Sequence, residues 1–208
     1  MTSNPVIPDT AVSRLATYLR VLNERRADAR QHVSSAFIGA AAGVSPDQVR
    51  KDLSHFGEFG RPGVGYDLEH LRHHLARILR LDRERTAVLV GAGSLGSALA
   101  RYTGFPQRGF RIAAVFDVDP LRVGTTLGDL TVEHVGCLRE RIVAVGASIG
   151  VVAVPRRAAQ TVVDQLAAAG VKAILNFAPG KVEVPGGVNV RSVDLARELE
   201  CLAYYLPG

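Results

Sequence analysis

The feature that most restricts the fold of this chain is a glycine-rich turn within "AVLVGAGSLGSALA", residues 87–100. Gly91, Gly93 and Gly96 follow an apolar run typical of a buried strand and precede an Ala/Leu-rich stretch typical of a helix. In that setting the first glycine allows a tight turn, the second lets the backbone approach a pyrophosphate, and the third lets the helix pack on the strand. The stretch therefore predicts the beginning of a Rossmann-like domain.

The pattern of apolar residues changes near residue 85. Before it, apolar residues recur at helical spacing; after it, β-branched runs alternate with helical stretches, which predicts an α/β fold with a doubly wound parallel sheet. We expect a DNA-binding domain, a Rossmann-like domain and a C-terminal helix, at residues 1–85, 86–192 and 193–208. The strands of the sheet are expected at residues 86–91, 110–117, 130–135, 148–155, 171–179 and 187–193.

An acidic residue at the end of the second strand indicates which dinucleotide the turn would bind. Asp117 ends that strand 21 residues after Gly96, where a carboxylate accepts hydrogen bonds from both ribose hydroxyls. The same carboxylate would repel the 2′-phosphate of NADP(H), and Arg122 is the only base nearby. The sequence therefore predicts an NAD(H) site. Its expected residues are Gly91, Ala92, Gly93, Ser94, Leu95, Gly96, Asp117, Val118, Arg122, Val154, Pro155 and Asn176.

The second part of the chain offers no evident acid or base for a reaction on the nicotinamide. A dehydrogenase needs such a group near the carboxyl ends of the later strands. The fourth strand is followed by Pro155 and two arginines, and His134, the one histidine in residues 86–208, falls within the third strand. We therefore expect a bound and sensed cofactor, and no catalytic residues. Two alternatives stay open: an NAD-dependent oxidoreductase and a protein that binds coenzyme A or another adenine nucleotide.

The first part has the pattern of a winged helix-turn-helix. Gly43 ends a short helix, and Ser45-Pro46-Asp47-Gln48 carries the N-cap serine, the proline and the capping-box glutamine that start a helix at residues 46–56. In this fold the second helix enters the major groove of DNA. The stretch "GEFGRPGVGY", with four glycines in ten residues, fits the hairpin of a wing. The expected DNA-binding residues are Ser45, Gln48, Arg50, Lys51, Ser54 and Arg61.

The net charge permits a nucleic-acid partner without indicating which part binds it. The formal charge is +5. Lys and Arg number 13 against 10 Asp and Glu in residues 1–85, and 12 against 10 in residues 86–208. The assignment of the first part to DNA therefore depends on its motif.

The sequence predicts neither a metal centre nor a membrane span. His70 and His74 stand one helical turn apart, but no third ligand follows at a useful spacing. Cys137 and Cys201 have neither metal nor redox spacing, which favours a reducing compartment. No apolar run approaches the ~18 residues of a membrane span, and residues 1–9 lack the pattern of a signal peptide. We therefore expect a cytoplasmic protein.

Three stretches together closely resemble one known family, the Rex redox-sensing transcriptional repressors. They are "GVSPDQVRKDLSHFGEFGRPGVGYD" (43–67), "VLVGAGSLGSALARYTGF" (88–105) and "FDVDPLRVG" (116–124). The likeness runs over nearly the whole chain. It implies a homodimer whose winged helices grip a palindromic operator in double-stranded DNA. It also implies Rossmann domains that sense the NADH/NAD+ ratio, with NADH releasing the DNA.

The resemblance also assigns roles outside these stretches. Tyr102 and Asp194 match the family's switch pair near the nicotinamide, with Arg14 on the first helix as their partner in one state. The C-terminal helix is typically exchanged between subunits of the family. That exchange fits a stripe of leucines without an evident partner in the chain, made of Leu195, Leu199, Leu202 and Leu206.

Two positions depart from the family pattern. Arg61-Pro62 stands where many relatives carry two basic residues, which would weaken the contact of the wing with DNA. Leu195 stands where some relatives carry Phe, which would change the apolar wall of the nicotinamide pocket.

Overall fold

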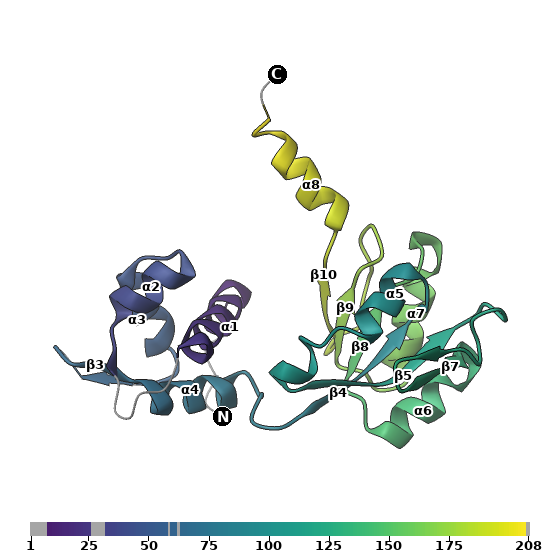
Figure 1. Ribbon diagram of the computed structural model, residues 1–208, viewed down its shortest axis with the longest axis horizontal. Coiled ribbons are helices and arrows are strands. Elements are labelled where there is room, and N and C mark those ends of the chain that lie inside the picture. The colour runs from purple at the N-terminus through teal and green to yellow at the C-terminus, as the bar shows by residue number, and fades with distance from the viewer. Residues whose placement is uncertain (1–7, 26–31, 58, 62, 207–208) are drawn as a thin grey trace. The chain divides into compact units, whose positions relative to one another are not determined.

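The computed structural model describes residues 8–25, 32–57, 59–61 and 63–206. The chain divides into two compact units, Met1–Arg83 and Glu84–Gly208 (Figure 1). Each unit has a hydrophobic core of its own.

The described part of the first unit contains four α-helices and a small antiparallel sheet. The helices are α1 (Asp9–Glu24), α2 (Ser35–Ala42), α3 (Pro46–Ser54) and α4 (Leu68–Ile78). The sheet has the order β1-β3-β2, built from β1 (His32–Val33), β3 (Gly65–Asp67) and β2 (Gly60–Arg61). β2 and β3 pair as an antiparallel hairpin after α3, which is the arrangement of a winged helix.

The helix boundaries in this unit follow from local chemistry. Ser34, Ser45 and Asp67 each cap a helix, because their side chains accept a hydrogen bond from the backbone N–H three residues later. Gly43 ends α2 in the left-handed conformation, with φ of 71°, which glycine adopts without strain. The expected turn is therefore confirmed, and α3 ends at Ser54, two residues before the expected end.

The core of the first unit joins α1 to the three other helices. Its aliphatic side chains come from every helix, so the unit buries a continuous apolar interior. The fully buried residues include Leu15, Tyr18 and Leu22 of α1, Ile38 of α2, Val49 of α3, and Leu71 and Leu75 of α4.

The second unit is built on a sheet of seven described strands in the order β10-β9-β8-β4-β5-β7-β6 (Figure 1). The strands are β4 (Arg85–Val90), β5 (Phe110–Asp117), β6 (Thr126–Leu127), β7 (Leu130–His134), β8 (Ile149–Val152), β9 (Ala173–Asn176) and β10 (Asn189–Ser192). All neighbours pair parallel except β6 and β7. Without β6, this is the 3-2-1-4-5-6 order of a Rossmann sheet, which confirms the predicted fold class.

The two faces of this sheet are covered differently. The helices are α5 (Ser94–Ala100), α6 (Leu138–Val145) and α7 (Arg156–Ala168). Phe116 and Val152 belong to the core cluster that contains α6 and α7. Leu89 and Val151, which point to the opposite face, cluster with Leu99 of α5.

A last helix, α8 (Leu195–Ala203), follows β10 and buries none of its side chains within the described chain. Its exposed leucines form one stripe at helical spacing: Leu195 at 56%, Leu199 at 69%, Leu202 at 59% and, just after the helix, Leu206 at 71%. Within the described ranges, no helix has the length and apolar character needed to cross a membrane.

Candidate functional site

The turn between β4 and α5 is so tight that two of its glycines leave no room for a side chain. A Cβ on Gly91 would lie 2.3 Å from the carbonyl oxygen of Ala153, and the φ of Gly91 is 103°. A Cβ on Gly96 would lie 1.8 Å from the carbonyl oxygen of Gly91. Both distances are far below van der Waals contact. The glycine spacing is therefore a steric requirement of the strand–turn–helix unit.

The helix after this turn begins directly at the turn, so its N-terminal N–H groups lie beside the glycines. α5 begins at Ser94, after Gly93, which supplies no side-chain cap. The N–H of Ser97 donates to the carbonyl of Gly93 at 2.8 Å, whereas the N–H groups of the three preceding residues have no intrahelical acceptor. Such a helix end favours an anion, and the sequence assigns it to the pyrophosphate.

Asp117, the last residue of β5, is fixed to the glycine turn. It is 8% exposed; its Oδ2 accepts from the N–H of Ala92 at 2.7 Å, and its Oδ1 accepts from the N–H groups of Val118 and Asp119 at 2.7 and 2.9 Å. Burial alone would raise the pKa of this carboxyl. The hydrogen bonds from Asp119, Ala92, Val118 and Arg122 outweigh burial and lower the pKa. Asp117 is therefore an ionised carboxylate at neutral pH.

Arg122 brings a cation to the same edge of the sheet. Its Nη1 lies 3.3 Å from Asp117 Oδ2 and its Nε lies 3.5 Å from Asp119 Oδ2. A Cβ on Gly93 would lie 3.3 Å from Arg122 Nη1, so the guanidinium lies across the second glycine of the turn. The side chain is 45% exposed and can meet a ligand phosphate at the turn while it pairs with Asp117.

Three further expected cofactor residues lie near this edge. Val118 follows Asp117 and is 67% exposed. Val154 and Pro155 connect β8 to α7, and the Cγ1 of Val154 would lie 3.1 Å from a Cβ on Gly91. These apolar side chains can contact the flat or apolar parts of a dinucleotide rather than its phosphates.

Asn176 has a structural role in this conformation. It is fully buried at the end of β9. Its Oδ1 accepts from the N–H of Ala178 at 3.0 Å, and its Nδ2 donates to the carbonyl of Ala178 at 3.1 Å and to Ser192 Oγ at 3.3 Å. The side chain therefore holds the loop after β9 and offers no exposed group to a ligand.

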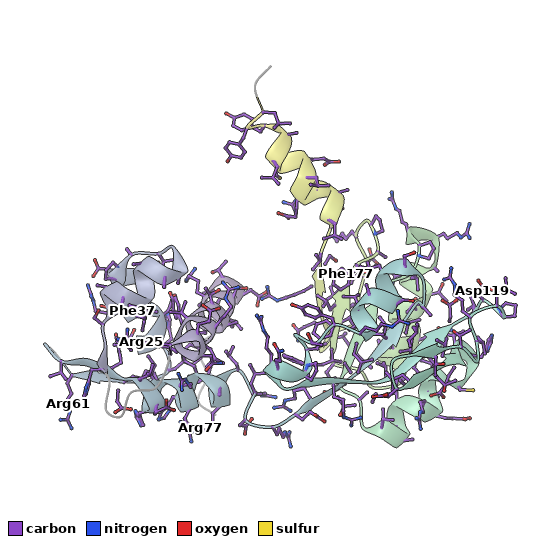
Figure 2. The ribbon with its side chains drawn as sticks, viewed as in Figure 1. Arg25, Phe37, Arg61, Arg77, Asp119 and Phe177 are labelled. Atoms are coloured by element: carbon purple, nitrogen blue, oxygen red, sulfur yellow. The ribbon has the colours of Figure 1, made fainter. Side chains whose placement is uncertain are left out.

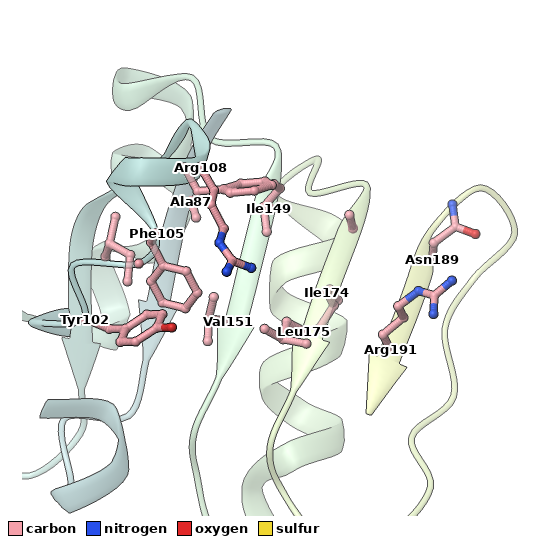
Figure 3. Close-up of a pocket in the computed structure, with 14 residues that line it drawn as sticks. Ala87, Tyr102, Phe105, Arg108, Ile149, Val151, Ile174, Leu175, Asn189 and Arg191 are labelled. Carbon is pink, nitrogen blue, oxygen red and sulfur yellow. The ribbon is translucent and has the colours of Figure 1, made fainter. Parts of the chain in front are cut away.

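An apolar groove of about 460 Å³ lies over the face of the sheet that carries Ile112, Val151 and Leu175. In Figure 3, Tyr102 and Phe105 form one side and Arg191 the other, above the surfaces of β8 and β9. The rings of Tyr102 and Phe105 pack edge to face at 5.1 Å between centroids. The groove includes Ile149, the first residue of β8, so it lies toward the amino ends of the strands and away from Asp117.

The expected DNA-binding residues cover the exposed side of α3 and the wing. Lys51, Ser54 and Arg61 are exposed, and Arg61 projects from β2 away from the helices of its unit (Figure 2). Arg50 is also exposed, but it pairs with Asp47 one turn earlier and donates to Ser35 Oγ at 2.8 Å. Arg50 must therefore exchange these partners to contact DNA.

Asp52 of α3 is a buried carboxylate that the sequence does not single out. It is 1% exposed and accepts four hydrogen bonds. Arg14 Nε and Nη2 donate at 2.6 and 2.7 Å, Tyr18 Oη at 2.7 Å, and Gln48 Nε2 at 2.8 Å. α1 and α3 are thus joined by one fully satisfied polar cluster, which we call the Asp52 cluster (Arg14, Tyr18, Gln48 and Asp52).

The Asp52 cluster holds its charges in fixed states. Burial opposes ionisation of Asp52, but the hydrogen bonds from Arg14, Tyr18 and Gln48 outweigh it and lower the pKa of that carboxyl. The hydrogen bond to Asp52 raises the pKa of Arg14. Burial, followed by the hydrogen bond to Asp52, raises the pKa of Tyr18. Asp52 is therefore charged, and its two nearest partners act as donors at any ordinary pH.

The histidines of α4 do not complete a metal site. The Nε2 atoms of His70 and His74 are 3.0 Å apart, and Arg77 Nη2 lies 3.0 Å from His74 Nδ1. Burial, then the charges of His70 and Arg77, lower the pKa of His74. Across the described ranges, no cluster of three or more His, Cys, Asp or Glu could hold a metal ion.

Two family models match the two parts of this chain. A model described as "Putative DNA-binding protein N-terminus" matches residues 6–54, and a model described as "CoA binding domain" matches residues 82–180. The first covers α1 to α3, and the second covers the glycine turn and Asp117.

Curated relatives match nearly the whole chain. It is 48% identical over 199 residues to the redox-sensing transcriptional repressor Rex of Streptomyces avermitilis, which covers 96% of this chain and 79% of the relative. It is 47% identical over 200 residues to the Rex of Syntrophomonas wolfei, which covers 96% of this chain and 95% of that relative. This chain belongs to the Rex family. Its members are named as transcriptional repressors, so the chain is a transcription regulator rather than an enzyme.

Solved structures of one Rex-family repressor, RSP, have the same fold. RSP in complex with β-NAD+ and operator DNA matches with a TM-score of 0.89 and 36% identity, over 96% of this chain and 92% of RSP. RSP in complex with β-NADH matches with a TM-score of 0.84 and 34% identity, over 96% and 93%.

The three switch residues expected from the Rex resemblance have other partners in this conformation. Arg14 belongs to the Asp52 cluster. Asp194 caps α8, because its Oδ1 accepts from the N–H groups of Ala196 and Arg197 at 3.1 and 3.2 Å. Tyr102 is 53% exposed and lines the apolar groove. The predicted contact among the three therefore stays a prediction.

The two departures from the Rex pattern have different surroundings. Arg61 is exposed in β2, and Pro62 lies outside the described residues. Leu195, at 56% exposure, begins α8 directly after the Asp194 cap. Its effect on a nicotinamide pocket stays a prediction.

Proposed function

We propose that this chain is a cytoplasmic repressor that binds palindromic operator DNA and is released by NADH, so that it senses the NADH/NAD+ ratio. The observation that carries the proposal is the likeness, over 96% of the chain, to a Rex-family repressor solved with β-NAD+ and operator DNA. The same repressor has been solved with β-NADH. We extend these ligands from that relative to this chain.

Asp117 and the glycine turn support NAD(H) as the ligand. The helix end at Gly93 and Ser94 favours the pyrophosphate, and Arg122 supplies a neighbouring cation. The ionised carboxylate of Asp117 can accept from ribose hydroxyls and would repel a 2′-phosphate. We keep the other expected cofactor residues as proposed contacts, with Asn176 acting through the loop that it holds.

The exposed cations of the first unit support DNA as the partner. Lys51 and Arg61 stand on α3 and on the wing, the two elements that reach DNA in a winged helix. We assign Arg50, Lys51 and Gln48 to contacts in the major groove. Arg61 can contact phosphate or the minor groove.

We also propose that the protein is a homodimer that exchanges α8. The leucine stripe of α8 has no cover within the described chain. The apolar groove next to Tyr102 supplies a second uncovered surface in the same unit. Burial of both between two copies would remove exposed apolar area from water. Leu199→Glu with Leu202→Glu should convert a dimer to a monomer in analytical ultracentrifugation.

The decisive measurement is the fluorescence anisotropy of a labelled operator duplex, titrated with NADH at fixed NAD+. We expect NADH to release the DNA at concentrations where NADPH has little effect. If NADH leaves binding unchanged, the sensor proposal is wrong. A parallel titration with coenzyme A separates the remaining alternative, since release by coenzyme A alone would assign the second unit to that ligand.

Two substitutions should separate the two sites. Asp117→Ala should remove most of the NADH response and leave operator affinity unchanged, because all four of its hydrogen bonds lie within the second unit, to the turn, the end of its own strand and Arg122. Arg50→Ala should weaken operator binding by about tenfold and leave NADH binding unchanged, as expected for loss of one base or phosphate contact. NADH binding is followed by calorimetry on the same samples.

A further inference from the structure

The Asp52 cluster restricts the orientation of one side chain at the start of the recognition helix. Gln48 is half-buried and donates from Nε2 to Asp52 Oδ1 at 2.8 Å. An ionised carboxylate only accepts hydrogen bonds, so the carboxamide must turn its NH2 group toward Asp52. The carbonyl oxygen of Gln48 and the second N–H of its NH2 group are then the groups left for another partner.

Asp52 can impose this orientation because it cannot turn itself. Arg14 donates a hydrogen bond to each oxygen of Asp52, at 2.6 and 2.7 Å, and Tyr18 donates to Oδ2 at 2.7 Å. The bidentate arginine fixes the plane of the carboxylate. Gln48 therefore meets a rigid acceptor, and the rotamer entropy that a free glutamine would lose on binding is already lost in the free protein.

The position of Gln48 places these remaining groups where bases are read. It is the third residue of α3, and the N-terminal residues of a recognition helix contact base edges in the major groove. A carbonyl acceptor next to an N–H donor complements the N6 amino group and N7 of adenine, which is the usual bidentate partner of Gln.

We propose that Asp52 is a specificity-determining residue that acts through Gln48, by presenting its carboxamide for bidentate recognition of an adenine. The proposal rests on the proposed DNA-binding function. Asp52 itself does not touch the DNA; it is a positioning residue. The neighbouring Arg50 lacks such support, because its bonds to Asp47 and Ser35 are exposed to solvent and can be exchanged for water or phosphate.

The test compares base preferences rather than affinity alone. The full chain is used to select duplexes from a random pool, and single base-pair changes are then introduced along the selected duplex. Gln48→Ala should lose preference at one adenine by about 5- to 150-fold, the range for one bidentate contact. Asp52→Asn should flatten the same position, and the double variant should add little, because both changes remove one contact.

Tyr18→Phe is the matched control. It removes one hydrogen bond to the same carboxylate but leaves the bonds from Arg14 and Gln48. It should keep the adenine preference even if it lowers stability. If Asp52→Asn keeps the preference, or weakens binding to every duplex by the same factor, Asp52 has only a structural role and the proposal is overturned.

A second measurement needs no folded Asp52 variant. In the NMR spectrum of the free protein, the Gln48 side-chain amide, identified by its loss in Gln48→Ala, should be as rigid as the backbone. Free rotation of that amide would overturn the proposal. If the wild-type chain selects no duplex, the proposed function itself fails. A selected duplex whose base preferences are unchanged by Gln48→Ala overturns only this inference.

Discussion

Asp52 and Asp117 are the two buried acidic side chains of the described chain, and they are satisfied in opposite ways. Asp117 takes three of its four hydrogen bonds from backbone N–H groups of the turn and of its own strand end. Asp52 takes all of its hydrogen bonds from side chains, namely those of Arg14, Tyr18 and Gln48. Burial opposes the charge in both cases, and hydrogen bonds overcome it.

The difference shows that a buried charge can be stabilised either by the backbone of a fold or by particular side chains of one sequence. Backbone donors around Asp117 come with any chain that forms the strand–turn–helix unit. Side-chain donors around Asp52 exist only where three specific residues meet across α1 and α3. A single substitution of a donor side chain can therefore disrupt the hydrogen bonds to Asp52. The backbone hydrogen bonds to Asp117 are lost mainly when the backbone of the turn is distorted.

The largest effect is expected from Asp52→Ala. It leaves the Arg14 guanidinium and the Tyr18 hydroxyl without their acceptor in a mostly buried place, which costs about 3 kcal/mol when one partner of a buried pair is removed. Arg14 is 28% exposed, so water offsets part of this cost. Hydrogen exchange of the α1 and α3 amides in the full chain measures the loss of unfolding free energy.

The matched control for this prediction is Asp47→Ala. It removes an exposed acid from the same helix, whose side chain is 87% exposed, and should change the unfolding free energy by less than about 1 kcal/mol. Equal losses in the two variants would show that the buried cluster contributes no more than a surface ion pair.

The second effect tests the backbone arrangement around Asp117. Gly96→Ala places a Cβ 1.8 Å from the carbonyl oxygen of Gly91, so the turn that carries the Ala92 N–H must move. We expect a loss of about 2 kcal/mol in the second unit, in the range for overpacking, together with loss of NADH binding in calorimetry. Gly186→Ala, where a Cβ meets open space, should change neither. Retained NADH binding in Gly96→Ala would contradict the steric argument.

The sequence can place Asp117 beside the glycine turn because the determinants of that arrangement are local. The glycine spacing and the acid at the end of the next strand lie within 27 residues and belong to one dinucleotide-binding motif. The Rossmann sheet is also predicted, apart from the two-residue strand β6, which is too short to leave a pattern. The apolar groove could not be predicted, because it depends on which face of the sheet the helices leave open.

The Asp52 cluster is not predicted because its partners are far apart in the sequence. Arg14 is 38 residues from Asp52, and on its own Asp52 resembles one more charge on a solvated helix. One local signal exists: Val49 and Leu53 are buried, and position 52 lies on the same face of α3. The capping box expected for Gln48 is wrong in one half. Its N–H donates to Ser45 Oγ, but its side chain donates to Asp52.

A smaller effect is expected from Tyr18→Phe. It removes one of four hydrogen bonds to Asp52 and keeps the aromatic packing, so the cost should be about 1 kcal/mol. Tyr66→Phe is the comparison, since the Tyr66 ring is also buried and its hydroxyl has no hydrogen bond to another described residue. In thermal unfolding of the full chain, the midpoint temperature of Tyr18→Phe should be lower than that of Tyr66→Phe. The reverse order would mean that the Tyr18 hydroxyl does not support Asp52.

The last prediction concerns the dependence of stability on pH, which is negligible at neutral pH and appears only in acid. It tests Asp52 and Asp117 separately, because they belong to different units. The pKa of Asp52 is lowered below 3.8 in the folded chain, so the unfolded chain takes up the proton first as pH falls. The stabilisation from Asp52 is therefore complete well above pH 3.8 and is lost as pH falls through the lowered pKa. Asp52→Asn should flatten the acid dependence of hydrogen exchange in α1 and α3. The strands β4 and β5 should keep theirs, because Asp117 titrates with the same sign in the second unit. An unchanged acid slope in α1 and α3 would show that Asp52 is not the group whose protonation weakens the first unit.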